Sequence, residues 1–256
     1  MFDFKGKVAM VTGGTTGIGF STAMMLAKGG ARVVIAGRGQ NKGAGAIEQL
    51  TRIEPKSIFI PGDISKISDC RRLVQETVSR MGHLDILVNS AGVYVGGPIE
   101  SVSEEEYHQV MDINVKGTFF MCQMALPEMR KSGGGAIVNV SSDSGIMGNT
   151  EAALYCASKG AVTIFTKALA VDVARENIRV NCVCPGDVQT PMLDRESAVA
   201  ENPETYLAEM QRHYPIGRVG KPEEVAATIC FLASQMAHFV VGAAWSIDGG
   251  LTSFSY

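Results

Sequence analysis

Short runs of apolar, β-branched residues alternate along the chain with longer stretches whose apolar residues recur at helical spacing. Several of these short runs are apolar at consecutive positions, which is typical of strands that helices cover on both faces. The predicted strands are 8–12, 33–36, 57–60, 86–89, 136–140, 179–183 and 244–247. The predicted helices are 20–28, 69–81, 104–129, 150–174 and 222–234. This alternation predicts an α/β fold with a doubly wound parallel sheet.

No repeat, low-complexity tract or linker interrupts this alternation. The glycine-rich stretch 132–135 is only a turn before the fifth predicted strand. We therefore predict a single domain over residues 1–256. The least patterned segment, 187–215, is expected to be a substrate loop within that domain.

The composition excludes several classes of protein. A formal charge of −3 with no basic run gives no footprint for nucleic acid. No apolar stretch reaches the roughly 18 residues of a membrane span, so we expect no membrane partner and a cytoplasmic location. The six cysteines are interpreted as reduced core thiols, and the four histidines are isolated. The sequence therefore predicts no metal site.

Tyr155 and Lys159 stand four residues apart within the predicted helix 150–174. At this spacing the ammonium lies one turn beyond the phenol, on the same face of the helix. A cation about 4–6 Å away stabilises a phenolate and moves the pKa of the tyrosine toward neutrality. The pair therefore suggests a general acid/base, although the same spacing also occurs on solvated helix faces.

A glycine-rich turn follows the first predicted strand and precedes the first predicted helix, which is the context of a dinucleotide-binding turn. Its glycines permit a tight turn, close backbone contact with phosphate and close helix packing. Free N–H groups at the start of the helix would face the pyrophosphate. The residues expected at the cofactor here are Gly13, Thr16, Gly17, Ile18 and Gly19.

Six motifs, in register with the predicted elements, resemble those of the short-chain dehydrogenases/reductases. They are Thr12-Gly13-x-x-x-Gly17-x-Gly19, Asn89-Ser90-Ala91-Gly92, Asn114, Ser142, Tyr155-x-x-x-Lys159 and Pro185-Gly186. The resemblance spans nearly the whole chain. It implies a Rossmann-type sheet of about seven strands and a homotetramer or homodimer. The implied activity is hydride transfer between a nicotinamide cofactor and a carbonyl or secondary alcohol.

The resemblance assigns catalytic roles to four residues. Tyr155 would give a proton to the substrate oxygen during reduction and take it during oxidation. Lys159 would also bond the nicotinamide ribose. Ser142 would hydrogen-bond the substrate oxygen, although a hydroxyl at a strand end is often only a cap or turn residue. Asn114 would hold a water behind Lys159, or would simply satisfy a buried neighbour.

The resemblance also places residues beside the cofactor after the later strands. Asp63 would meet the adenine amino group, unless it is only a helix N-cap. The Thr190 hydroxyl and the backbone of Val188 would hold the nicotinamide carboxamide. Ser90 replaces the asparagine more often found there, but it keeps hydrogen-bonding capacity. The full set beyond the glycine-rich turn is Arg38, Asp63, Ile64, Asn89, Ala91, Gly92, Tyr155, Lys159, Pro185, Gly186, Val188 and Thr190.

Gly37 and Arg38, at the end of the second predicted strand, favour NADP(H) over NAD(H). Relatives that use NAD usually carry an aspartate where Gly37 stands, and its carboxylate would repel a 2′-phosphate. Arg38 could pair with that phosphate and stack on adenine. Thr16 points the other way, because many NADP-using relatives have a basic residue there. NAD(H) stays possible, since Arg38 could be an ordinary solvated arginine.

The expected substrate pocket comprises 93–98, 144–151 and 187–215, beyond the carboxyl ends of the strands. Asp187 would add a preference for polar or cationic groups. Six residues could form an apolar lid over a hydrophobic or cyclic ketone, or could pack against their own domain instead. These are Met192, Leu193, Tyr206, Leu207, Met210 and Tyr214.

Other functions stay open at this point. A non-catalytic dinucleotide sensor or regulatory module would not need the intact set Ser142, Tyr155 and Lys159. A 3-oxoacyl thioester reductase is an alternative enzyme. Enoyl reduction is disfavoured, because family members with that chemistry commonly separate the Tyr and Lys more widely. By resemblance, the oligomer would form through helices 104–129 and 150–174.

Overall fold

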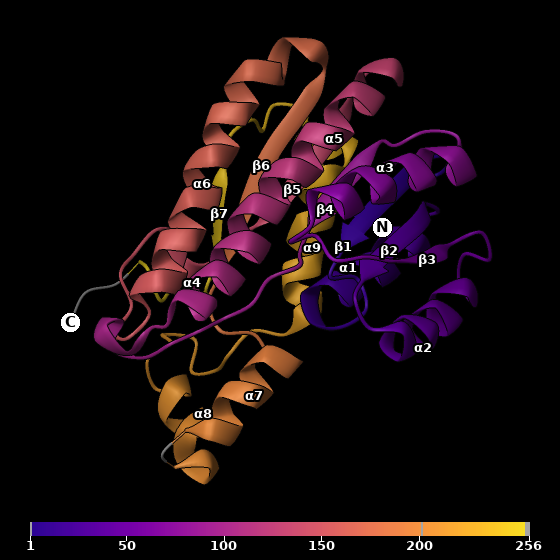
Figure 1. The fold of residues 1–256 in the computed structure, drawn as a ribbon. Coiled ribbons are helices and arrows are strands. Elements are labelled where there is room, and N and C mark those ends of the chain that lie inside the picture. The colour runs from indigo at the N-terminus through magenta and orange to yellow at the C-terminus, as the bar shows by residue number, and fades with distance from the viewer. Residues whose placement is uncertain (1, 201, 254–256) are drawn as a thin grey trace.

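A computed structural model describes residues 2–200 and 202–253; Glu201 of the predicted substrate loop and the ends of the predicted 1–256 domain lie outside them. Within this range the chain forms one sheet in the order β3-β2-β1-β4-β5-β6-β7, and every pair is parallel (Figure 1). The strands are β1 Val8–Thr12, β2 Arg32–Gly37, β3 Ile58–Pro61, β4 Ile86–Asn89, β5 Gly135–Val140, β6 Ile178–Pro185 and β7 Ala244–Ile247. The predicted Rossmann-type sheet is confirmed.

Helices cover both faces of this sheet. One face carries α1 Gly17–Lys28, α2 Gln40–Thr51 and α9 Pro222–Ala233. The other carries α3 Ile67–Met81, α4 Glu104–Val110, α5 Thr118–Lys131 and α6 Ala153–Val173. Two further helices, α7 Pro191–Val199 and α8 Pro203–Gln211, lie apart from the sheet at the foot of the view in Figure 1. They follow β6 and bring the segment after it over the carboxyl edge of the sheet.

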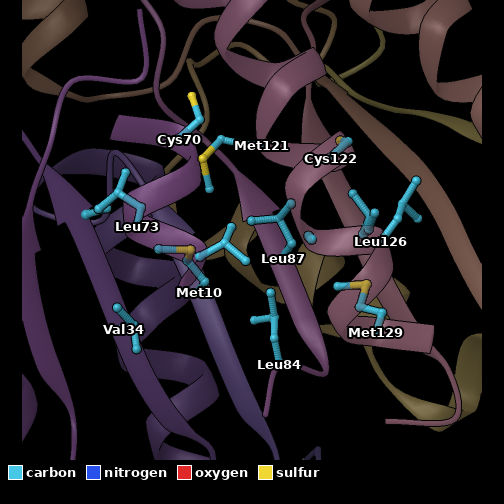
Figure 2. Packing of buried hydrophobic residues seen from close by; sticks show 14 of the residues in the cluster. Met10, Val34, Cys70, Leu73, Leu84, Leu87, Met121, Cys122, Leu126 and Met129 are labelled. Carbon is cyan, nitrogen blue, oxygen red and sulfur yellow. The ribbon is translucent and has the colours of Figure 1, made fainter. Parts of the chain in front are cut away.

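Consecutive apolar residues in the strands feed two separate cores. In β1, Met10 packs with α3 and α5, whereas its neighbour Val11 packs with α1 and α9. Figure 2 shows the first of these cores, in which Met10 and Leu87 of the sheet meet Leu73 and other helical side chains. Because side chains alternate between the faces of a strand, a strand with two covered faces needs apolar residues at every position.

The structure differs from the predicted helices in two ways. The predicted helix 104–129 is three segments, because α4 and α5 are joined by a π-helical segment, Met111–Gly117. Helices α2, α7 and α8 were not predicted. Gly43 and Gly45 weaken the helical pattern of α2. Pro191 and Pro203 start α7 and α8 at a position where a proline is tolerated, but both helices are short and mostly polar.

Among the described residues, no helix is both long and apolar enough to cross a membrane. Within the same part of the chain, no cluster of three or more His, Cys, Asp or Glu side chains could hold a metal ion. The six cysteines are free, and all but Cys156 are buried.

Candidate active site

The glycine-rich turn joins β1 to α1 at the point where the strand order reverses. Gly13 and Gly17 have φ angles of +65° and +56°, in the left-handed region that favours glycine. A methyl group built on Gly13 would lie 2.8 Å from Ala91 Cα at the end of β4, and one on Gly19 would collide with the Gly13 carbonyl. The Thr16 side chain makes no cap bond to α1. This bare turn and its free N–H groups fit a pyrophosphate.

Helix α6 brings Tyr155 and Lys159 to the same edge of the sheet. Lys159 is 5% exposed; its Nζ donates a hydrogen bond of 2.9 Å to the Val140 carbonyl and lies 5.6 Å from the centre of the Tyr155 ring. Burial lowers the pKa of Lys159 to about 8. A methyl group on Gly92 would lie only 3.5 Å from this Nζ. The ammonium therefore faces the space that Gly92 leaves open.

The prediction of a lowered phenol pKa is wrong for this structure. Burial raises the pKa of Tyr155 above its ordinary value, and a hydrogen bond with the Ser142 hydroxyl offsets only part of this shift. Three nearby carboxylates raise it further, those of Asp143, Glu196 and Asp187. Burial is the largest cause of this shift, because it disfavours the charged phenolate. The phenol of Tyr155 is therefore protonated at neutral pH.

Ser142 follows β5 and caps a short turn, as the simpler interpretation of this hydroxyl expects. Its Oγ accepts a bond of 3.2 Å from the Ser144 N–H and donates one of 2.6 Å to Asp143 Oδ1. Asp143 Oδ2 accepts a bond of 3.0 Å from Asn149 Nδ2. The Ser142 hydroxyl also hydrogen-bonds the Tyr155 phenol, so one residue both caps the turn and lies beside the candidate general acid/base.

Asn114 lies in the π-helical segment and joins two other elements. Its Oδ1 accepts from the Val93 N–H at 2.9 Å, and its Nδ2 donates to the Val93 carbonyl at 2.9 Å and to Ser158 Oγ at 3.1 Å. The side chain thus fixes the backbone after β4 against α6, one residue before Lys159. This is the satisfied buried residue of the simpler interpretation, and the bound water stays a prediction.

The side chains of two of the expected cofactor residues, Asn89 and Asp63, bond to other parts of the protein. Asn89 is buried, and its Nδ2 donates to Asn139 Oδ1 at 2.9 Å and to Cys122 Sγ at 3.3 Å. Asp63 Oδ1 accepts from both the N–H and the hydroxyl of Ser65. The residue that caps α3 is Lys66, so the N-cap alternative for Asp63 is wrong.

The remaining expected residues lie as follows. Thr190 stands at the N-cap position of α7 without a side-chain cap bond, and it faces the glycine-rich turn, since a methyl group on Gly17 would lie 3.2 Å from its Cγ2. Val188 is buried and its backbone pairs with Gly220. Ile64 belongs to the core. Pro185 ends β6, and Gly186 packs against Tyr214. The Ala91 N–H donates a hydrogen bond to Thr12 Oγ1. Arg38 is exposed after the end of β2.

Three polar residues beside Tyr155 were not expected there. The Tyr94 ring packs edge-on against the Tyr155 ring, with centroids 5.0 Å apart. Glu196 of α7 lies close enough to raise the pKa of both tyrosines, and burial raises its own pKa to about 7. Asp143 directly follows Ser142. Its place next to a candidate serine was the only signal in the sequence, whereas Tyr94 and Glu196 lie within expected pocket segments.

Most of the predicted apolar lid packs into its own small core. Leu193 and Tyr214 are buried together with Val219, and Tyr206 and Met210 pack against them. The Tyr214 hydroxyl donates a bond of 2.7 Å to Asp187 Oδ2 and accepts one from the Asp187 N–H. Burial raises the pKa of Asp187. These side chains position the segment after β6.

The chain is similar in sequence and in fold to several known proteins. Residues 13–252 match a family model described as enoyl-(acyl carrier protein) reductase. An uncharacterized oxidoreductase of Thermotoga maritima is 42% identical over 98% of this chain and 99% of its own. L-fucose dehydrogenase of Mus musculus is 40% identical over 96% of this chain and 89% of its own. The crystal structure of levodione reductase superposes with a TM-score of 0.94 at 31% identity, over 98% of this chain and all of its own.

Proposed function

Since the chain belongs to the short-chain dehydrogenase/reductase family, whose members are NAD(P)-dependent oxidoreductases, we propose that it transfers a hydride between the nicotinamide and a carbonyl or secondary alcohol. Tyr155 is the general acid/base of this proposal. The observation that carries it is the placing of Tyr155, Lys159 and Ser142 together at the carboxyl edge of the sheet. A sensor or regulatory module without turnover has no need for this set.

The cofactor, when bound, supplies the site that gives or takes the hydride. Gly13 and Gly17 would hold its pyrophosphate at the bare turn, and Thr190 faces that turn from α7. Lys159 would bond the ribose, because its ammonium faces the open space at Gly92 and stays charged below its pKa of about 8. Tyr155 would hold the transferred proton on its phenol oxygen.

We also propose NADP(H) as the cofactor, because Arg38 is exposed after β2 and Gly37 offers no carboxylate. We expect kcat/KM to be higher with NADPH than with NADH. The substitution Arg38→Gln is expected to lower kcat/KM for NADPH about tenfold, the factor of one charge-assisted bond to phosphate, and to leave the value for NADH within twofold. Arg52→Gln, on the exposed end of α2, is the matched control. A wild-type preference for NADH would contradict the proposal.

For the substrate we propose a ring that carries several hydroxyl groups. Two carboxylates near Tyr155, those of Asp187 and Glu196, are hydrogen-bond acceptors, and a carboxylate can accept hydrogen bonds from ring hydroxyls. The similarity to an L-fucose dehydrogenase supports this class. We therefore still propose a cyclic substrate. A hydrophobic ketone is less favoured, because Leu193 and Tyr214 of the predicted lid are buried in their own core.

A 3-oxoacyl thioester reductase is the second candidate. The family model carries an acyl carrier protein in its description, which favours acyl substrates. Enoyl reduction itself is disfavoured by the spacing of Tyr155 and Lys159.

A substrate panel separates these functions. We would follow nicotinamide reduction and oxidation with hydroxylated rings, unsubstituted cyclic alcohols and ketones, and 3-oxoacyl thioesters, with Tyr155→Phe as control. We expect kcat/KM on a hydroxylated ring to exceed that on an unsubstituted ring of the same size at least tenfold, the equivalent of about one charge-assisted hydrogen bond. Higher activity on thioesters would select the second candidate. Cofactor binding without turnover on any member, in either direction, would favour the sensor.

We propose a homo-oligomer, with a homotetramer as the form expected from the resemblance, in which α5 and α6 meet their copies. A mostly apolar groove of about 290 Å³ lies between α5 and α6 of the same chain. Phe119 beside it is 43% exposed, and Val171 further along α6 is 78% exposed. Apolar faces of this kind are common at subunit interfaces.

A further inference from the structure

Three carboxylates raise the pKa of Tyr155, and two of them are already bound within the protein. Asp143 accepts a hydrogen bond at each of its oxygens, of 2.6 Å and 3.0 Å. Asp187 Oδ2 accepts a bond of 2.7 Å from the Tyr214 hydroxyl. The third carboxylate, that of Glu196, makes neither a hydrogen bond nor an ion pair within residues 2–200 and 202–253. Glu196 is therefore the carboxylate that is free to bind a substrate.

Helix α7 turns Glu196 inward. Glu196 follows Leu193 by three residues, so both side chains project from the same face of the helix. Leu193 is 6% exposed in the small core after β6, against which Tyr206 of α8 also packs. Asp194 and Arg195, between the two, are exposed, whereas Glu196 is half-buried. The register of α7 thus directs this one acid of the helix toward the site.

Three phenol rings lie near the Glu196 carboxylate. Its negative charge raises the pKa of Tyr94, Tyr155 and Tyr206, which come from three different elements. The rings of Tyr94 and Tyr155 pack edge-on, with centroids 5.0 Å apart. An aromatic ring attracts a cation to its face, and a carboxylate forms strong hydrogen bonds with an ammonium. A protonated amine is the ligand group that both kinds of side chain would bind.

An ammonium also fits the charges around Glu196 better than a hydroxyl does. The negative charge of Asp187 acts on Glu196, and a positive charge beside them would offset this repulsion. The cation that the protein itself supplies here, Lys159, donates to the Val140 carbonyl at 2.9 Å. Arg195 is exposed and lies beyond ion-pair distance of Glu196. The positive charge is therefore left for the substrate to bring.

We propose that Glu196 is a specificity-determining residue that selects, among hydroxylated rings, those that also carry a protonated amino group. The inference rests on the proposed function, because it refines the substrate of the same site. The amino group binds the Glu196 carboxylate while the reacting oxygen lies at the Tyr155 phenol. The preference for cationic groups that was expected at Asp187 belongs to Glu196 instead, since one oxygen of Asp187 is bound by Tyr214.

This preference depends on pH, because Glu196 must be ionised to bind the ammonium. Burial and the charge of Asp187 raise the pKa of Glu196 to about 7, and the charge of Arg195 opposes them. The three phenols have raised pKa values and stay protonated at neutral pH, and the acids of α8, Glu204 and Glu209, are exposed. An aliphatic amine titrates near roughly pH 10, as lysine does. The preference is therefore present above the pKa of Glu196 and is lost as the pH falls through it.

Pairs of alcohols test the proposal. We would oxidise the positional isomers of aminocyclohexanol, each paired with the cyclohexanediol of the same substitution pattern, and take the ratio of the two kcat/KM values. Groups that act on both alcohols alike, such as Lys159 and Tyr155, cancel in this ratio. At about pH 7.5, wild type is expected to favour the amine of the best pair about tenfold, the factor of one hydrogen bond to a charged group. Glu196→Gln is expected to bring the ratio to within about twofold of one.

The ratio is also expected to fall severalfold in wild type at about pH 6, where most of Glu196 is protonated, and to stay flat in Glu196→Gln. Asp194→Asn is the matched control, because it removes the same charge from an exposed position of α7. Its ratio is expected to lie within about twofold of wild type. Glu196→Gln is expected to keep or raise the melting temperature, since it removes an unpaired carboxylate. A wild-type ratio near one for every isomer, or a ratio that survives Glu196→Gln, would overturn the proposal.

A binding measurement separates this proposal from the proposed function. Calorimetry would titrate the same aminocyclohexanols into Tyr155→Phe and into Tyr155→Phe/Glu196→Gln, each saturated with NADP⁺. The second protein is expected to bind the best isomer about tenfold more weakly. If wild type turned over no alcohol or ketone, the proposed function would fail, and this difference in dissociation constant would still decide the role of Glu196. Equal binding to both proteins, or binding to neither, would count against Glu196.

Discussion

The substitution Tyr155→Phe is expected to lower kcat/KM by about 10³–10⁴-fold in both directions, because it removes the hydroxyl that we propose exchanges a proton with the substrate oxygen. The fold is expected to survive, since the phenyl ring keeps its edge-on contact with Tyr94. Steady-state kinetics measures the loss, and a cofactor dissociation constant within a factor of about two or three of wild type would locate that loss in the chemical step.

Tyr94→Phe is the matched control for this prediction. It removes a hydroxyl from the neighbouring ring, whose raised pKa of about 12 makes it a poor proton donor at neutral pH. We expect the Tyr94 variant to keep activity within about tenfold of wild type, the range of one lost hydrogen bond to substrate. If Tyr155→Phe fell no further than Tyr94→Phe, the proton would have to come from another group, and the assignment of Tyr155 would be wrong.

The sheet could be predicted from the sequence because its strands are buried on both faces. Such strands need apolar residues at consecutive positions, and this pattern stands out without knowledge of the contacts. Helix α2 could not be predicted in the same way. Its Gly43 weakens the helical pattern, and the reason for that glycine is tertiary: a methyl group there would collide with the Phe59 ring of β3. Nothing near Gly43 in the sequence reveals this contact.

The candidate site, too, could be predicted only in part from the sequence. The spacing of Tyr155 and Lys159 was visible in the sequence, and α6 does place both side chains at the carboxyl edge of the sheet. The pKa values of the two side chains could not be predicted from this spacing, because they depend on burial by β5, β6 and α7. The π-helical segment at Asn114 was also hidden, since one extra residue in a turn scarcely changes the periodicity of the apolar positions.

Gly13→Ala is expected to lower the free energy of unfolding by about 2–5 kcal/mol. The residue must hold a φ of +65°, which costs a side chain about 1–2 kcal/mol, and its new methyl group would lie 2.8 Å from the Ala91 backbone, which adds an overpacking cost of about 1–3 kcal/mol. Backbone atoms cannot turn aside as a flexible side chain can. Urea unfolding measures the loss.

The same substitution is expected to raise the cofactor dissociation constant more than tenfold, because β1 and β4 must separate to admit the methyl group and the turn between them then changes shape. Gly45→Ala is the control: it lies in α2 with open space around it and is expected to be neutral or to stabilise by up to about 1 kcal/mol. A Gly13→Ala protein with wild-type stability and cofactor affinity would show that this turn does not need a bare, left-handed residue. The phosphate site would then have to be sought elsewhere along the carboxyl edge of the sheet.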